Sequence, residues 1–101
     1  MNITSHHEGN SLKVSLSGKL TFSDNAAFQS LTQMQSEHQV QQIDILLNNL
    51  DYIDSSGIGM LLVLKEKCDE IGATMTLSQP KGQVAKILRI ACIDRVIPIL
   101  P

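Results

Sequence analysis

Aromatic residues and clustered positive charges are scarce in this sequence. It contains no tryptophan, one tyrosine and two phenylalanines, so stacking against bases or sugars has little to work with. Its eight lysines and arginines are scattered, with no two adjacent, and the formal net charge is −2. A surface that binds nucleic-acid phosphates needs clustered positive charge. The composition therefore argues against a nucleic-acid partner.

Long hydrophobic runs are also absent. The longest apolar run covers residues 58–64 and includes Gly59, whereas a membrane-spanning helix needs about 20 apolar residues. No positively charged segment precedes an apolar stretch near the N-terminus, so the sequence predicts no signal peptide. We therefore expect a cytoplasmic protein that makes no direct contact with a membrane.

The two cysteines and three histidines do not form a metal-binding pattern. The separation of Cys68 and Cys92 fits no zinc spacing. Each lies in an apolar pattern typical of a helix, so we predict two packed, reduced thiols. His6 and His7 are adjacent on a predicted strand and would point to opposite faces. Together with His38 they are expected at the surface, and we expect neither a metal nor another cofactor.

Strand patterns alternate with helix patterns along the chain, which is typical of an α/β domain. We predict a single domain over residues 1–101, with a mixed β-sheet of about five strands and three or four helices. The strands are predicted over residues 2–8, 12–17, 42–48, 73–77 and 93–99, and the helices over residues 24–38, 56–71 and from the 79–82 turn to Ala91.

Two of these strands predict how the sheet is covered. Apolar and polar residues alternate over 12–17, so this strand should face the core on one side and water on the other, with helices mainly on one face of the sheet. Residues 42–48 carry apolar side chains on both faces, which favours a central position. Pro98 lacks a backbone N–H, which places the last strand at an edge.

The rest of the chain is organised around residues 51–62, DYIDSSGIGMLL. An apolar strand leads into this stretch and an apolar helix leaves it, so its acid, its two hydroxyls and its glycines lie at a helix N-terminus. Ser55 or Ser56 could cap that helix, which is worth about 1 kcal/mol. We expect Ile58, Leu61 and Leu62 to form the stripe that faces the sheet. We expect Met60, Val63 and Leu64 to lie partly off this stripe, which leaves apolar surface beside the serines.

Three further roles of this turn can be compared. A serine nucleophile needs a base and an oxyanion hole, but the G-x-S-x-G pattern is absent and no histidine is near in sequence. Free N–H groups at the helix start could bind an anion, but Asp54 adds negative charge and no lysine or arginine is close. A phosphoserine would be tolerated by the same N–H groups, yet would repel a partner packed on the adjacent apolar surface. This third role, a switch rather than a catalytic site, is compatible with capping.

The sequence resembles STAS domains, specifically the bacterial anti-sigma factor antagonists, over essentially its whole length. The strongest likeness is the strand–turn–helix of residues 52–62. Further similar segments are residues 16–20, residues 43–50, Gly72-Ala73 before a strand, and residues 84–90.

The resemblance implies a binding protein that is not an enzyme. In the family, the first serine after the aspartate, here Ser55, is phosphorylated by a serine protein kinase that is often the anti-sigma factor itself. The unphosphorylated form binds the anti-sigma factor, and a serine phosphatase reverses the modification. The alternative is a non-phosphorylated STAS scaffold subunit of a transporter complex, such as a lipid-transport ABC system.

The expected contact surface surrounds Ser55, and we expect the protein itself to be a monomer or a weak dimer. The residues predicted to bind the partner are Asp24, Asp54, Ser55, Ser56, Gly57, Ile58, Met60 and Leu61.

Overall fold

A computed structural model describes residues 1–37 and 40–101, together with their side chains apart from those of residues 31–32 and 34–37. His38, which we expected at the surface, therefore lies outside the described residues. The elements are β1 (Asn2–Glu8), β2 (Ser11–Leu20), the 3-10 turn η1 (Phe22–Asp24), α1 (Asn25–Glu37), β3 (Gln42–Ile53), α2 (Ser55–Glu70), β4 (Thr74–Ser78), α3 (Gly82–Ile90), the 3-10 turn η2 (Ile93–Arg95) and β5 (Ile99–Leu100).

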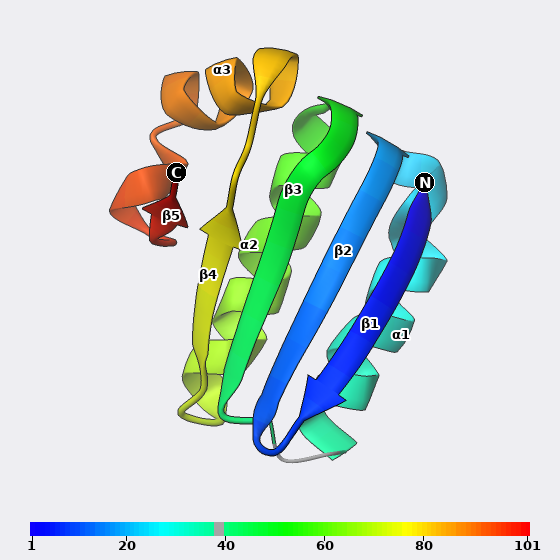
Figure 1. Cartoon of the computed structure of the whole chain (residues 1–101), viewed down its shortest axis with the longest axis vertical. Helices are drawn as coiled ribbons and strands as arrows, with labels where there is room; N and C mark the ends of the chain where they lie inside the picture. Colours follow the sequence, from blue (N-terminus) through cyan, green and yellow to red (C-terminus); the bar gives the residue numbers. More distant parts are fainter. Residues whose placement is uncertain (38–39) are drawn as a thin grey trace.

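The strands form one five-stranded mixed sheet in the order β1-β2-β3-β4-β5. β1 and β2 are antiparallel and are joined by a turn in which Gly9 has a φ of 58°. The remaining neighbours are parallel, with α1, α2 and α3 lying between successive strands in the chain. α1 and α2 lie behind the sheet and α3 lies at one end of it (Figure 1). The predicted α/β domain, with about five strands and three or four helices, is confirmed, and the described residues form five strands and three α-helices.

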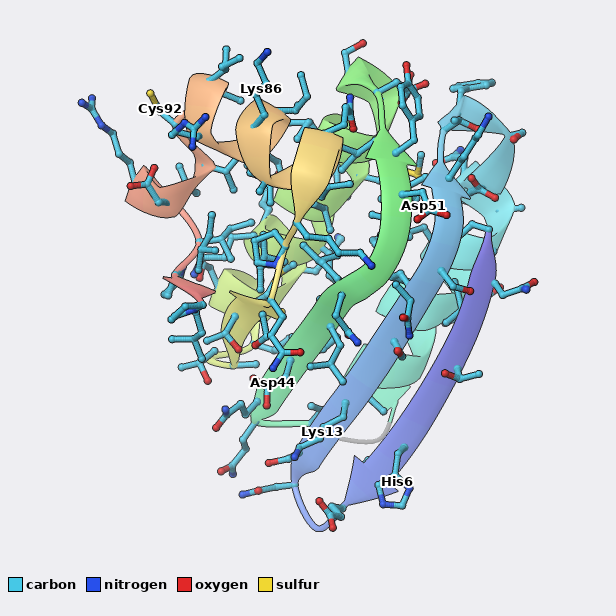
Figure 2. The ribbon with its side chains drawn as sticks, turned by 45° about the horizontal axis from the view of Figure 1, so that its top comes forward. His6, Lys13, Asp44, Asp51, Lys86 and Cys92 are labelled. Atoms are coloured by element: carbon cyan, nitrogen blue, oxygen red, sulfur yellow. The ribbon has the colours of Figure 1, made fainter. Side chains whose placement is uncertain are left out.

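The core lies between the sheet and these helices. Val14, Leu16 and Ile45 are completely buried. On the other face of the same strands, Lys13 is exposed and Asp44 is half-buried, and Figure 2 shows both at one end of the sheet. The alternation in β2 therefore has the predicted cause, since one face of the sheet is packed and the other is polar. The central position of β3 and the edge position of the last strand are confirmed as well.

β3 is longer than predicted. It continues past Asn48 to Ile53, because Leu50 and Ile53 are buried and pair with Gly18 and Leu20 of β2. The pairing shifts register twice along this stretch, so the simple alternation that identifies a strand in sequence is interrupted. The extension brings the end of β3 directly to the first residues of α2.

The end of the chain differs more from expectation. A last strand is present at the sheet edge, but the predicted bounds of residues 93–99 are wrong. Ile93–Arg95 forms a 3-10 turn, and only Ile99–Leu100 pairs with β4. The buried residues here are Ile93 and Ile97, a helical spacing that sequence alternation does not separate from a strand. Cys92 turns the chain with a φ of 56° and is exposed, so the packed thiol predicted there is wrong, whereas Cys68 is buried.

Candidate functional site at the start of α2

The turn between β3 and α2 is held by Asp54. Its carboxylate Oδ1 accepts a hydrogen bond from the Gly57 N–H at 2.8 Å. Its carbonyl accepts the first helical bond, from the Ile58 N–H at 3.0 Å, and its own N–H donates to the Leu20 carbonyl at 3.3 Å. The cap of α2 is therefore Asp54, not Ser55 or Ser56 as the sequence suggested. A carboxylate at this position is favoured by the free N–H groups of the helix start.

Gly57 fixes how closely α2 approaches the sheet. A Cβ atom at this position would lie 2.7 Å from Ile53 Cγ1 and 2.7 Å from the Leu20 carbonyl oxygen. Contacts that short do not occur between a real side chain and the backbone, so only glycine fits here without a shift of the helix. The start of α2 is thus seated directly against the end of β2.

Because Asp54 caps the helix, the side chains of Ser55 and Ser56 do not take part in capping. Ser55 is exposed and Ser56 is half-buried. Within the described part of the chain, neither hydroxyl makes a hydrogen bond, and neither backbone N–H has an acceptor. Two free N–H groups at the positive end of a helix favour added negative charge close by. The turn therefore presents an unengaged hydroxyl where a phosphate could be accommodated.

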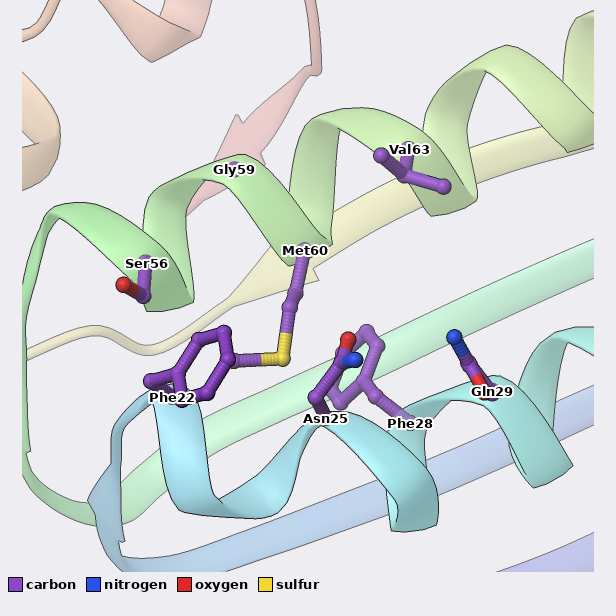
Figure 3. Close-up of a pocket in the computed structure, with 8 residues that line it drawn as sticks. All are labelled: Phe22, Asn25, Phe28, Gln29, Ser56, Gly59, Met60 and Val63. Atoms are coloured by element: carbon purple, nitrogen blue, oxygen red, sulfur yellow. The ribbon is translucent and has the colours of Figure 1, made fainter.

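A first apolar hollow, the α1–α2 groove, lies on the Ser56 side and has a volume of about 390 Å³. Phe22 and Val63 stand at its surface with 71% and 54% of their area exposed, while Phe28 is buried. Figure 3 shows the Met60 side chain pointing from α2 toward Phe22. The groove is lined by Phe22, Asn25, Phe28, Gln29, Ser56, Gly59, Met60 and Val63.

A second apolar hollow, the α2–α3 groove, lies on the Ser55 side and has a volume of about 490 Å³. Gln83 of α3 joins its two walls, because Nε2 donates to the Ile53 carbonyl at 3.1 Å and Oε1 accepts from the Ile53 N–H at 3.1 Å. The groove is lined by Tyr52, Ile53, Asp54, Ser55, Ile58, Gln83, Ile87, Ile90 and Ala91. The serine pair therefore stands on a ridge between two apolar grooves.

The structure confirms one part of the predicted apolar face of α2 and corrects another. Val63 was expected partly off the packed stripe, and it is 54% exposed. Met60 and Leu64 were expected partly off the packed stripe, but they are 8% and 0% exposed. Leu61 is 0% exposed and Gly57 is buried, so neither is available for direct contact with a partner. The apolar surface beside the serines comes from the walls of the two grooves, to which Val63 belongs as predicted. Of the predicted contact residues, those that line the grooves are Asp54, Ser55, Ser56, Ile58 and Met60.

Asp24 has a local role in η1. Its Oδ2 accepts the Thr21 N–H at 2.9 Å, and its Oδ1 lies 3.5 Å from the amino group of Met1. Its side chain is only 13% exposed. Asp24 therefore shapes the turn that carries Phe22 to the rim of the α1–α2 groove, and it does not line the groove itself.

Sequence reasoning missed several groove residues, among them Phe22, Gln83 and Ile90. Phe22 lies in what reads as a connection, Ile90 lies outside the regular apolar stripe of α3, and Gln83 reads as an ordinary polar helix residue. Ile90 is 65% exposed. Its place outside the apolar stripe, one position before the end of the helical pattern, is the signal that could have indicated this exposure. Nothing in the sequence pairs Gln83 with a strand thirty residues earlier.

The described residues give little support for metal binding at this site. They include no group of three potential metal ligands. His6, on β1, is exposed and lies 3.9 Å from Glu8. No described helix combines the length and the apolar character needed to cross a bilayer.

A search of curated proteins found no match. The structure is similar to an anti-sigma factor antagonist from Mycobacterium paratuberculosis, with a TM-score of 0.86 and 15% identity over 99% of this chain and 85% of that one. Unphosphorylated SpoIIAA, an anti-sigma factor antagonist of Bacillus, gives a TM-score of 0.78 and 17% identity over 97% and 87%.

The same fold occurs in a different setting. The STAS domain of a SulP transporter from Vibrio cholerae gives a TM-score of 0.72 and 20% identity over 86% of this chain and 70% of that one. The TM-scores of 0.72 to 0.86 establish a shared fold, and identities of 15% to 20% extend the likeness no further than the fold. The family model for the STAS domain matches residues 2–101. This chain therefore belongs to the STAS domain family.

Proposed function

We propose that this protein is an anti-sigma factor antagonist whose binding is switched by phosphorylation of Ser55. The observation that carries the proposal is the state of Ser55, which is exposed at the first turn of α2 with its hydroxyl unengaged among the described residues. The structural neighbours described as anti-sigma factor antagonists support it, and one of them, SpoIIAA, is known in both unphosphorylated and phosphorylated forms.

The proposed switch depends on where the phosphate charge would lie. A phosphoserine carries about −1.5 to −2 charges at neutral pH. The free N–H groups of Ser55 and Ser56 favour that charge, so the fold tolerates it. A partner packed over the adjacent grooves would instead bury it without a counter-charge, which costs several kcal/mol. Since about 1.4 kcal/mol is a tenfold change in affinity, one phosphate is enough to release the partner.

The proposed circuit has a binding partner and two modifying enzymes, and this chain is not itself an enzyme. The unphosphorylated form would hold an anti-sigma factor, a serine protein kinase would modify Ser55, and a serine phosphatase would restore it. We propose that Ser55, Ser56, Ile58, Met60 and Asp54 contact the partner. Gly57 and Leu61 support this surface from beneath, and Asp24 shapes the neighbouring turn.

The test compares Ser55→Ala and Ser55→Asp as baits in lysate from the native cells. A partner should be retained by Ser55→Ala and released by Ser55→Asp, because only the second carries the negative charge. Ser5→Asp is the matched control, since Ser5 is an exposed serine on β1. The retained protein is then produced recombinantly, and its affinity for each variant is measured by calorimetry. Equal affinity for Ser55→Ala, Ser55→Asp and phosphorylated protein would exclude the switch.

A second candidate function is a scaffold subunit of a transporter complex, which the likeness to a transporter STAS domain favours. In that case Ser55 would stay unmodified. Mass spectrometry of the protein from native cells distinguishes the two functions: a phosphate localised to Ser55 supports the switch, and its absence under every growth condition supports the scaffold.

A further inference from the structure

The α1–α2 groove and the α2–α3 groove differ in charge. Among the described residues that line the α1–α2 groove, the polar ones are Asn25, Gln29 and Ser56, and none of them is charged. The α2–α3 groove includes the carboxylate of Asp54. A charged side chain that entered the α1–α2 groove would lose its water shell without meeting an opposite charge there. The α1–α2 groove is therefore suited to an occupant whose inserted side chains are uncharged.

Phe22 stands at the rim of the α1–α2 groove on a braced turn. It is 71% exposed, the highest exposed fraction among the large apolar side chains of the described residues. The turn η1 is closed by Asp24, which accepts the Thr21 N–H at 2.9 Å and donates its own N–H to the Thr21 carbonyl at 3.0 Å. An aromatic side chain on a fixed turn loses little conformational freedom on binding, and aromatic residues are enriched among those that dominate binding energy. Phe22 is therefore suited to anchor a partner.

The α1–α2 groove leads directly to the serine turn. Ser56, Met60 and Val63 follow one another at helical spacing on the α2 wall, so they lie along one face of that helix. Between them, a Cβ atom at Gly59 would meet nothing within 4 Å, which leaves the wall open to an approaching side chain. Figure 3 shows Ser56 at one end of this wall and Val63 at the other. An occupant of the groove would therefore contact the residue next to Ser55.

We propose that the α1–α2 groove receives an uncharged, apolar segment of the partner protein, and that Phe22 enters an apolar pocket of the same partner. This inference rests on the proposed function, and it adds which groove is used and the chemistry of the segment. It also explains the effect of phosphorylation, because a segment without positive charge cannot pair with a phosphate on Ser55 when the interface closes over it. The partner still touches the serine ridge, whereas Ile90, on the α3 wall of the other groove, is not part of the interface.

A lipid surface and a second copy of this chain are the competing occupants. Recognition of anionic lipids typically uses clusters of basic residues, and the described residues that line the groove include no lysine or arginine. In a symmetric dimer, Phe22 of each copy would have to fill the groove of the other. Binding to vesicles or to a second copy would therefore depend on Phe22 in the absence of the partner, so the isolated protein can be used to detect both.

The test uses the protein that Ser55→Ala retains and Ser55→Asp releases in the pull-down described above, with affinities measured by calorimetry in the Ser55→Ala background. Phe22→Ala should weaken binding roughly tenfold or more, as expected for an aromatic anchor. Val63→Ala, on the α2 wall, should weaken it by a smaller factor. Ile90→Ala is the matched control and should leave affinity unchanged, because Ile90 is also exposed, at 65%, but lines the α2–α3 groove. Circular dichroism should show that all three variants remain folded, since the three side chains are exposed.

A second pair of variants tests whether the inserted segment is uncharged. Gln29 lines the groove and is exposed, so Gln29→Glu and Gln29→Lys introduce opposite charges at one position. Both should weaken binding several-fold, because neither charge meets an opposite charge in an uncharged segment. Gln79→Glu and Gln79→Lys are the matched controls and should leave affinity unchanged, since Gln79 is exposed and lines neither groove. Tighter binding by either Gln29 variant would reveal a segment of the opposite charge and overturn the inference.

The remaining outcomes separate this inference from the Ser55 switch. Unchanged affinity in Phe22→Ala, or an equal loss in Ile90→Ala, would overturn the choice of groove while the switch stands. If no protein is retained by Ser55→Ala and released by Ser55→Asp, both proposals fall. Self-association of the isolated protein that Phe22→Ala abolishes, at the concentrations used for partner binding, would assign the groove to a second copy. Co-sedimentation with phosphatidylglycerol vesicles that depends on Phe22 would assign it to a membrane, and either result would overturn the inference.

Discussion

At the scale of single residues, two glycines in α2 have opposite surroundings. Gly57 has no room for a Cβ atom, whereas a Cβ atom at Gly59 would meet nothing within 4 Å. Both read in sequence as part of one small-residue turn. Their difference depends on Leu20, a residue of a distant strand, so it could not be predicted from local pattern.

Alanine substitutions at these two glycines should therefore shift stability in opposite directions. Gly57→Ala overpacks the junction with β2 and should cost roughly 1–3 kcal/mol. Gly59→Ala removes a flexible residue from a helix interior and should stabilise by about 1 kcal/mol, which raises Tm by roughly 4–8 °C for a domain of this size. Thermal unfolding followed by circular dichroism measures both changes. A shift of the same sign in the two variants would contradict the packing described here.

At the scale of elements, α3 is tied to the end of β3 by one side chain. Gln83 occupies both backbone hydrogen-bonding groups of Ile53, so it acts where a neighbouring strand would otherwise pair. The strand and helix types along the chain could largely be predicted, because hydrophobic periodicity reports which face is buried. Gln83, the length of β3 and the turn at Cys92 could not be predicted, because each depends on residues far apart in sequence.

Replacing Gln83 with alanine should destabilise the protein by about 1–3 kcal/mol, the cost of leaving backbone groups unsatisfied. Gln83→Glu should cost less than Gln83→Ala if one of the two bonds survives, because the carboxylate still accepts from the Ile53 N–H. Chemical denaturation gives the stabilities, and amide hydrogen exchange at Ile53 reports the bond directly. Gln33→Ala, at an exposed position of α1, is the control. Unchanged exchange at Ile53 in Gln83→Ala would show that the side chain does not hold β3.

At the scale of the whole molecule, four of the exposed apolar residues divide between the two grooves. Phe22 and Val63 border the α1–α2 groove, and Tyr52 and Ile90 belong to the α2–α3 groove. The sheet carries a polar uncovered face. The covering of the sheet on one face could be predicted from the alternation in β2 and the apolar character of β3. The position of the grooves could not, because it depends on how α1 and α3 flank α2.

We expect the isolated protein to be a monomer or a weak dimer for this reason. Stable dimers typically bury roughly 1,200–2,000 Å² of surface, and among the described residues the apolar walls are divided between two grooves. Sedimentation velocity over a micromolar concentration series should show a monomer, with association only at the upper end. A dimer that persists at nanomolar concentration would contradict this arrangement.

The seating of Gly57 against Leu20 limits what a modification at Ser55 can do. The helix start is packed so closely there that even a Cβ atom would not fit. In the proposed switch, we therefore expect the phosphate to be read at the surface by the protein that meets it, and not to be passed through the domain as movement. Removal of the phosphate should then restore the original surface without any refolding.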